Sequence, residues 1–167
     1  GYHTYDNKIK VKDSDVYDLA SITKIGATVP ALMKLVDEGV FCVDSTLGNY
    51  LSLEGSNKND LIIREVLTHQ SKLIPWIPFY RQTLEQESNS NYMQLRDTLY
   101  SKLKSDIFSV NVADSLYLHF SFPDSIIQQV KDSELLDKKE YIYSDLGYYL
   151  LKEIIENITN QDLDNYL

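Results

Sequence analysis

The segment from Leu19 to Gly39 constrains the fold most, because its apolar residues recur at helical spacing. Steps of three and four residues place these side chains on one stripe of an α-helix. The stripe consists of Ile22, Ile25, Val29, Leu32 and Val36. Pro30 removes one backbone hydrogen bond, so we expect a kink there, which Gly26 four residues earlier eases. The sequence predicts a helix that starts near Ser21 and ends at Gly39, a residue suited to the left-handed conformation after a helix.

The remaining segments predict a mostly helical chain with little sheet. We expect helices in "DLIIREVLTH", capped by Asp60, in "YMQLRDTLYSKLKSDIF" from Tyr92, in "DSIIQQVKDSELL", and in "LGYYLLKEIIENIT" from about Asp145. "NQDLDNYL" starts a further helix. Residues 1–12 alternate between polar and apolar around a turn-like Asp-Asn pair, which predicts a short hairpin or sheet edge.

The charge and the cysteine content exclude several classes of function. The chain has 25 acidic and 16 basic residues and a net charge of −9, which argues against nucleic acid or an anionic membrane as the main partner. No apolar run is long enough to span a membrane. The single cysteine, Cys42, rules out an internal disulfide, and its apolar neighbours predict a buried, unreactive thiol. His3 and His119 lack ligand partners at useful spacing, so we expect neither metal nor cofactor.

A serine followed three residues later by a lysine, Ser21 and Lys24 in "SITK", stands at the start of the first predicted helix. Positions i and i+3 share a helix face, so a lysine there can take the serine proton. The alternative is a serine N-cap beside a solvated lysine. The same spacing recurs at Ser101 and Lys104 inside a predicted polar helix. Position at a helix start favours the first pair.

A proton relay would need a second polar group, and "YSD" at Tyr143, Ser144 and Asp145 offers one at the start of the last long helix. "YDN" at Tyr5 matches the same pattern, and the chain has 13 tyrosines. His69 is expected to be structural, bonding a loop carbonyl.

The only tryptophan, Trp76, lies in a loop between two prolines. It predicts either a buried loop anchor or a wall beside a substrate.

Together, "SITKIGATVPALMKLVDEG", "VLTHQS" and "YSDLGYYLLKEIIENITNQDLDNYL" resemble the serine β-lactamase and penicillin-binding-protein superfamily. The likeness is to its class C-related branch, of the kind found behind a family 3 glycoside hydrolase domain. It implies the helical subdomain of an α+β fold and an extracytoplasmic location. It also implies that Ser21 is the acylated nucleophile, Lys24 its proton acceptor, Tyr143 a general base or relay, and Asp145 the residue at the usual asparagine position. The backbone N–H of Ser21 would form half of an oxyanion hole.

The chain departs from the family pattern at several points. Asp145 replaces asparagine, Lys72 replaces a common glycine, and the family's [KH]-[ST]-G strand motif is absent. There is no initiator Met or signal peptide, so we interpret the chain as one truncated domain. Its expected parts are a sheet remnant (1–18), a helical subdomain (19–140) and the tyrosine motif with its helix (141–167).

Two functions therefore stay open. The first is a serine acyl-transfer hydrolase for a peptidoglycan peptide, an ester or a β-lactam. The second is a non-catalytic module that retains the fold and partners a glycoside hydrolase domain. We expect this fragment to be inactive, and its exposed sheet edge either to pair with a second chain or to be disordered.

Overall fold

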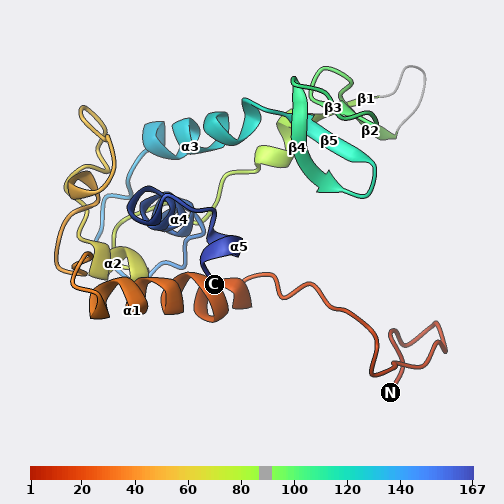
Figure 1. Ribbon diagram of the computed structural model, residues 1–167, viewed down its shortest axis with the longest axis horizontal. Helices are drawn as coiled ribbons and strands as arrows, with labels where there is room; N and C mark the ends of the chain where they lie inside the picture. The colour runs from red at the N-terminus through yellow and green to blue at the C-terminus, as the bar shows by residue number, and fades with distance from the viewer. Residues whose placement is uncertain (87–91) are drawn as a thin grey trace.

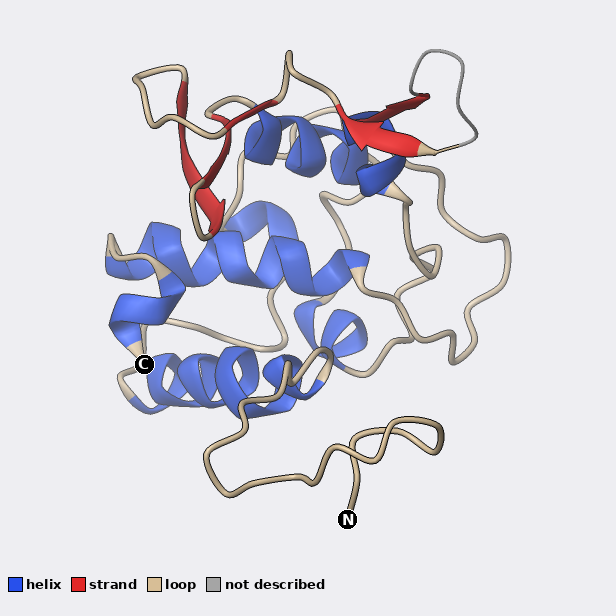
Figure 2. Cartoon of the chain, turned by 90° about the vertical axis from the view of Figure 1, so that its right-hand side faces the viewer, coloured by secondary structure: helices blue, strands red, loops and turns tan. Residues whose placement is uncertain are grey.

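Helix α4 lies at the centre of the protein, between α1 on one side and α3 on the other (Figures 1 and 2). The computed structural model describes residues 1–86 and 92–167. The helical elements are η1 (Lys24–Thr28), α1 (Val29–Asp37), η2 (Leu47–Asn49), α2 (Ile63–Leu67), η3 (Phe79–Thr83), α3 (Phe122–Asp132), α4 (Leu146–Thr159) and α5 (Leu163–Tyr166). The strands are β1 (Leu84–Gln86), β2 (Met93–Leu95), β3 (Tyr100–Ser101), β4 (Phe108–Ala113) and β5 (Leu116–His119).

Helix α4 is central because its apolar residues recur at helical spacing on a broad face. The buried residues are Leu146, Gly147, Leu150, Leu151, Ile154 and Ile155. The helix contacts α2, α3, α5 and η1. Asn160 ends it in the left-handed conformation, with φ of 54°. The sequence prediction of a strong helix from about Asp145 is thus confirmed.

Two small antiparallel sheets lie at one end of the molecule (Figure 1). Strand β1 pairs with β2, and the second sheet has the order β3-β5-β4. The predicted helix from Tyr92 is therefore wrong. Residues distant in the chain pair across this sheet, for example Tyr100 with Leu118 and Ser101 with Tyr117. This pairing provides hydrogen-bond partners for the strand backbone that a helix would have found locally. The described fold combines the predicted helices with more sheet than the sequence indicated.

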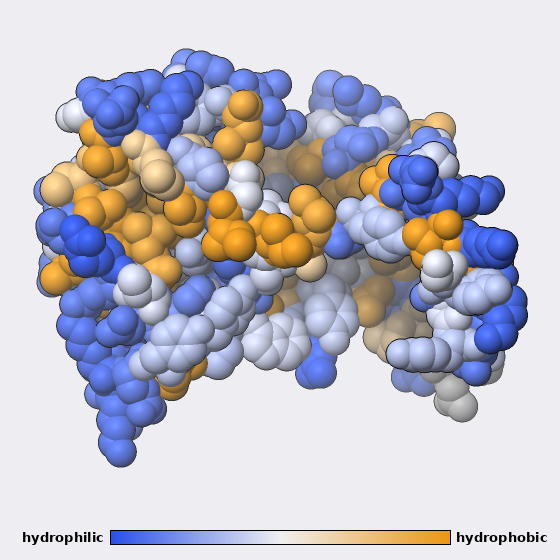
Figure 3. Space-filling model, turned by 90° about the horizontal axis from the view of Figure 1, so that it is seen from below, coloured by the Kyte–Doolittle hydropathy of each residue, from blue (hydrophilic) through white to orange (hydrophobic). Residues whose placement is uncertain are grey.

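The first predicted helix forms, but its buried face matches the predicted stripe only in part, at Leu32. Ile22, Ile25 and Val36 are exposed, at 56%, 68% and 44%. The buried residues of η1 and α1 are Thr28, Ala31, Leu32 and Leu35. Figure 3 shows apolar side chains gathered on the lower face of the molecule, over α1. Periodicity identified the helix, whereas packing into the common core decided which of its residues are buried.

The sequence predicts a kink at Pro30, but the irregular part of the helix is a π-helical segment, η1, which precedes the proline and runs directly into α1. Pro30 occupies the first turn of α1, where its missing N–H is tolerated. Gly26 has no atom within 4 Å of the position that a Cβ would take. The irregularity therefore lies in the turn before the proline and not at the proline itself.

Three smaller predictions have mixed outcomes. Residues 1–12 reverse direction through a single antiparallel bridge between Tyr2 and Lys10 and form no extended strand. Asp60 does not cap α2, because the helix begins at Ile63 and its N-cap residue is Ile62. Cys42 is exposed, contrary to the expected burial.

No helix among the described residues is long and apolar enough to cross a membrane.

Candidate active site

Ser21 and Lys24 meet at the start of the N-terminal helix. Lys24 Nζ donates a hydrogen bond to Ser21 Oγ at 3.0 Å, as their spacing predicts. Ala20, directly before the serine, has φ of 44°, a left-handed conformation that costs free energy for a residue with a Cβ. Strain of this kind concentrates at functional sites. The local backbone therefore presents Ser21 in a geometry that helix formation alone does not require.

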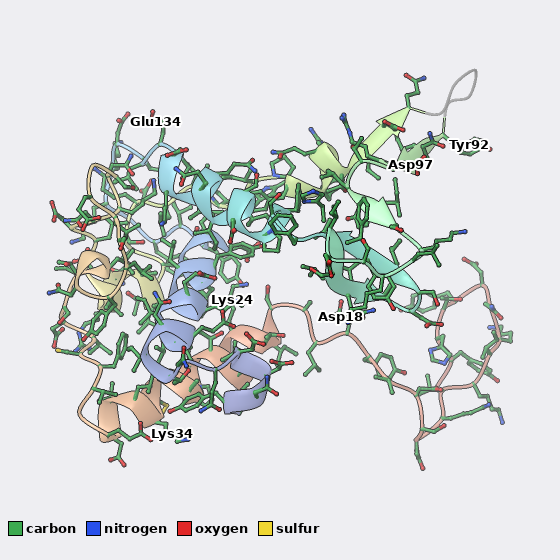
Figure 4. The ribbon with its side chains drawn as sticks, turned by 45° about the horizontal axis from the view of Figure 1, so that its top comes forward. Asp18, Lys24, Lys34, Tyr92, Asp97 and Glu134 are labelled. Carbon is green, nitrogen blue, oxygen red and sulfur yellow. The ribbon has the colours of Figure 1, made fainter. Side chains whose placement is uncertain are left out.

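Tyr143 and Asp145, just before α4, complete a cluster of four side chains. Asp145 Oδ1 accepts a hydrogen bond from Lys24 Nζ at 2.6 Å, between residues 121 positions apart. Tyr143 lies beside Ser21 and Lys24, and its ring centre lies 5.2 Å from Lys24 Nζ. Figure 4 shows Lys24 where the N-terminal helix faces α4. The structure therefore brings together all four residues that the sequence singled out.

The loop around Pro75 holds the "YSD" segment in place through the backbone. Asp145 N donates to Pro75 O at 2.8 Å, and Ser144 Oγ donates to Ile74 O at 2.7 Å. Ser144 is only 3% exposed, and its Oγ also accepts from Leu146 N at 3.2 Å. These bonds fix where α4 begins. They consequently set the positions of the side chains on either side of Ser144.

His69 supports the tyrosine of the cluster. Its Nδ1 accepts a hydrogen bond from Ser144 N at 3.2 Å, and its ring centre lies 4.4 Å from that of Tyr143. Burial, followed by the charge of Lys24, lowers the pKa of His69, so the ring is neutral and carries its proton on Nε2. The expected structural role agrees with this geometry. The expected bond from the ring to a loop carbonyl is wrong, because the ring accepts an N–H instead.

Contacts within the cluster shift the pKa values of Lys24 and Tyr143 in opposite directions. Burial lowers the pKa of Lys24, but hydrogen bonds and charge from Asp145 and Tyr143 outweigh it and leave that pKa raised. Hydrogen bonds from Ser21 and Lys24 lower the pKa of Tyr143. At neutral pH Lys24 is therefore an ammonium that donates to Ser21 Oγ. The group whose ionisation is favoured beside the serine is the Tyr143 hydroxyl.

Two cavities adjoin the cluster and share Asp145. The first, of about 390 Å³, is lined by Ser21 and Lys24 together with residues of α4 such as Tyr148. The second, of about 410 Å³, is lined mainly by aromatic and aliphatic side chains and includes Trp76. Trp76 is 54% exposed, so the buried-anchor interpretation is wrong and the wall interpretation agrees with its position. Sequence reasoning missed Tyr149, which lines both cavities and carries no motif of its own.

The competing motif matches lie outside the cluster. Ser101 is in β3, where its hydroxyl bonds to Leu103, and not in the polar helix that the sequence predicted around it and Lys104. Tyr5 is 98% exposed in the N-terminal segment. Lys72, at a common glycine position of the family, has φ of 64°, which explains why glycine suits that position. Among the described residues, no group of three or more His, Cys, Asp or Glu side chains is placed to hold a metal ion.

A serine–lysine pair on one helix that lies beside a tyrosine at the start of another is typical of the serine β-lactamase and penicillin-binding-protein class. The chain is of this class, as the sequence resemblance implied. The chain belongs to the beta-lactamase family, whose model matches residues 1–167. No solved structure matches the chain.

Several curated proteins are similar to the chain. A protein of Escherichia coli O157:H7, provisionally named D-alanyl-D-alanine carboxypeptidase, is 28% identical over 95% of this chain and 32% of its own length. A Salmonella typhimurium protein of the same provisional name is 30% identical over 95% of this chain and 32% of its own length. An N-acetylmuramyl-L-alanine amidase of Bacillus subtilis is 29% identical over 94% of the chain and 31% of its own length. The chain thus spans about a third of the length of these relatives.

Proposed function

We propose that the protein is a serine acyl-transfer hydrolase in which Ser21 is the nucleophile. The observation that carries this proposal is the position of Lys24 Nζ, 3.0 Å from Ser21 Oγ and 2.6 Å from Asp145 Oδ1. The names of the relatives, carboxypeptidase and amidase, support a substrate related to peptidoglycan. They also support an extracytoplasmic location. The substrate class is a peptidoglycan peptide or an ester, with a β-lactam as the third candidate.

In the proposed mechanism the Ser21 proton passes to Tyr143 as phenolate, or to Lys24 as neutral amine, while Oγ attacks the substrate carbonyl carbon. The Ser21 backbone N–H contributes to stabilising the oxyanion. Collapse of the tetrahedral intermediate breaks the bond to the leaving group, which takes the proton held by Tyr143 or Lys24. Water then hydrolyses the Ser21 ester. Asp145 sets the charge on Lys24, and its carboxylate disfavours substrates with an anionic group close to Ser21, which weighs against β-lactams.

One observation favours the second candidate, a non-catalytic module that docks to a glycoside hydrolase domain. The ion pair with Asp145 holds Lys24 in the protonated form, in which it cannot accept the serine proton. In this alternative the cluster serves to join the N-terminal helix to α4. A catalytically silent 167-residue chain that becomes reactive in a longer protein would favour the hydrolase.

Intact mass after incubation with a fluorophosphonate or a reactive β-lactam tests the hydrolase proposal. The longer protein should gain an adduct that Ser21→Ala abolishes. Ser101→Ala is the matched control, because Ser101 has the same spacing to a lysine but lies outside the cluster. We expect the 167-residue chain alone to react slowly or not at all. Absence of an adduct on the longer protein would contradict the hydrolase and leave the docking module.

The N-terminal hairpin carries a further proposal, that its exposed edge pairs with a second copy of the chain. The bridge between Tyr2 and Lys10 is the only pairing of this segment among the described residues, and Tyr5 beside it is exposed. Sedimentation of the chain across a concentration series tests this. A single monomeric species would contradict it.

A further inference from the structure

The second cavity beside Asp145 combines aromatic walls with one charge. It lies between the loop at Trp76, η3, α3 and the start of α4, with a volume of about 410 Å³. Trp76, Tyr80 and Tyr149 contribute aromatic side chains that remain partly exposed. Asp145 is the single charged residue in its lining. The cavity therefore offers aromatic surface and a carboxylate to one ligand group.

The position of Asp145 connects this cavity to the reacting atom. Asp145 also lines the cavity of Ser21, and only the Nζ of Lys24 separates its carboxylate from Ser21 Oγ. Lys24 occupies Oδ1, and among the described residues no hydrogen bond to Oδ2 is seen. A group in the aromatic cavity would therefore lie near an oxygen of Asp145 that is still able to accept a cation. It would also belong to a substrate within reach of Ser21.

Such surroundings select by charge. The faces of Trp and Tyr rings carry negative potential and attract an ammonium group. The Asp145 carboxylate adds an attraction that its ion pair with Lys24 reduces. An anionic group would meet repulsion from both. A neutral alkyl group would gain only the free energy of burying its apolar surface. The net charge of −9 favours a cationic ligand at longer range as well.

We infer that this cavity binds an ammonium group of the substrate, so that the preferred acyl donor is a cationic one. This inference rests on the proposed function for its link to catalysis, but the binding itself does not require a reactive Ser21. Trp76, Tyr149 and Asp145 are the residues that recognise the cation.

Fluorescence of Trp76, the only tryptophan in the chain, reports binding without any chemistry. The probes are 4-(trimethylammonio)butanamide and its neutral isostere 5,5-dimethylhexanamide, which differ by one nitrogen for one carbon. The ammonium probe should bind with a Kd about tenfold lower than the neutral one. Equal affinity for the two probes, tighter binding of the neutral one, or no saturable response to either would overturn the inference.

Variants distinguish the effect of the cavity residues on the Kd ratio from the effect of the overall net charge. Asp145→Asn and Tyr149→Leu should each bring the ratio of the two Kd values toward one, whereas Tyr149→Phe, which keeps the ring, should preserve it. Asp44→Asn removes the same charge from an exposed pair with Arg64 and should leave the ratio unchanged. A ratio lowered equally by Asp44→Asn would assign the preference to net charge and contradict the cavity.

The matching p-nitrophenyl esters extend the test to catalysis in the longer protein. Release of nitrophenolate that depends on Ser21 should be about tenfold faster for the cationic ester than for the neutral one, and slowest for a 4-sulfobutanoyl ester. If no ester reacts while the ammonium amide still binds, the hydrolase proposal fails and the cation site stands. If all esters react at similar rates and the probes bind equally, the cation site fails and the hydrolase stands.

Discussion

Asp145 is the residue whose chemistry separates this site from the family pattern, in which asparagine is usual. Its carboxylate is 42% exposed, whereas the Lys24 side chain that it pairs with is 15% exposed. A carboxylate in this position keeps the lysine protonated, and an amide would not. If Ser21 is the nucleophile, as we propose, the identity of this one side chain decides whether lysine or tyrosine acts as its base.

Asp145→Asn should shift the pH dependence of acylation to lower pH. A base is active when deprotonated, and the hydrogen bond and charge of Asp145 act to raise the pKa of Lys24. Removing the charge lowers that pKa, so the rising limb of log kcat/KM against pH should begin earlier. The measurement is a pH–rate profile with a neutral ester, with Asp44→Asn as the control. A limb that stays in place would show that Lys24 does not control the rate.

Tyr143→Phe should reduce Ser21-dependent ester hydrolysis by about 10²–10⁴-fold, the range typical of a lost acid–base group. The ring is 42% exposed and phenylalanine retains its contact with His69, so the unfolding midpoint should change little. Tyr5→Phe alters the other match to the tyrosine pattern and should leave the rate unchanged. A Tyr143→Phe enzyme that retained most of its rate would remove the tyrosine from the mechanism.

Helix α4 depends on a glycine to reach its neighbours. A Cβ on Gly147 would lie 2.4 Å from Val66 Cγ1 and 3.2 Å from Leu73 Cδ1. The glycine therefore permits close packing of α4 against α2 and against the loop that precedes Pro75. Through this contact, packing in the core sets the distance between the "YSD" segment and the loop that holds it.

Gly147→Ala should destabilise the fold, because overpacking costs about 1–3 kcal/mol and exceeds the gain of about 1 kcal/mol in helix propensity. Urea unfolding gives the free energy. Gly26→Ala, where the added methyl meets no neighbour within 4 Å, should be neutral or stabilising.

Adding Val66→Ala to Gly147→Ala removes the clashing methyl, so the double variant should lose less stability than the sum of the two single losses. Strictly additive losses would show that the clash is not the cause.

For the molecule as a whole, the N-terminal segment differs from the helical body. Residues 1–12 are exposed and extend away from it (Figure 1), whereas α1 and α4 share a core. Brief digestion with trypsin should therefore cut after Lys8, Lys10 and Lys12 before it cuts after Lys34, which is also exposed but lies in α1. Mass spectrometry of the first fragments gives the order. Early cleavage at Lys34 would contradict a stable N-terminal helix.

Local patterns were sufficient for the parts of this protein that depend on neighbours in sequence. The periodic apolar residues of α4 predicted that helix, and the segment after Ser21 predicted the N-terminal helix. The spacing of Ser21 and Lys24 predicted that their side chains meet, because the geometry of a helix turn needs no other part of the chain. The ordered motifs also placed Tyr143 and Asp145 in the same candidate site.

Long-range packing decided the rest. The sheet of β3, β5 and β4 forms through pairs such as Tyr100 with Leu118, and no local pattern identifies these partners. Only packing into the common core determined that Leu35, and not Ile25, is buried, although both lie in the N-terminal helix. The aromatic cavity likewise draws on Trp76 and Tyr149 from separate elements. These features depend on contacts between residues far apart in the chain, whose energies appear only once the elements have packed.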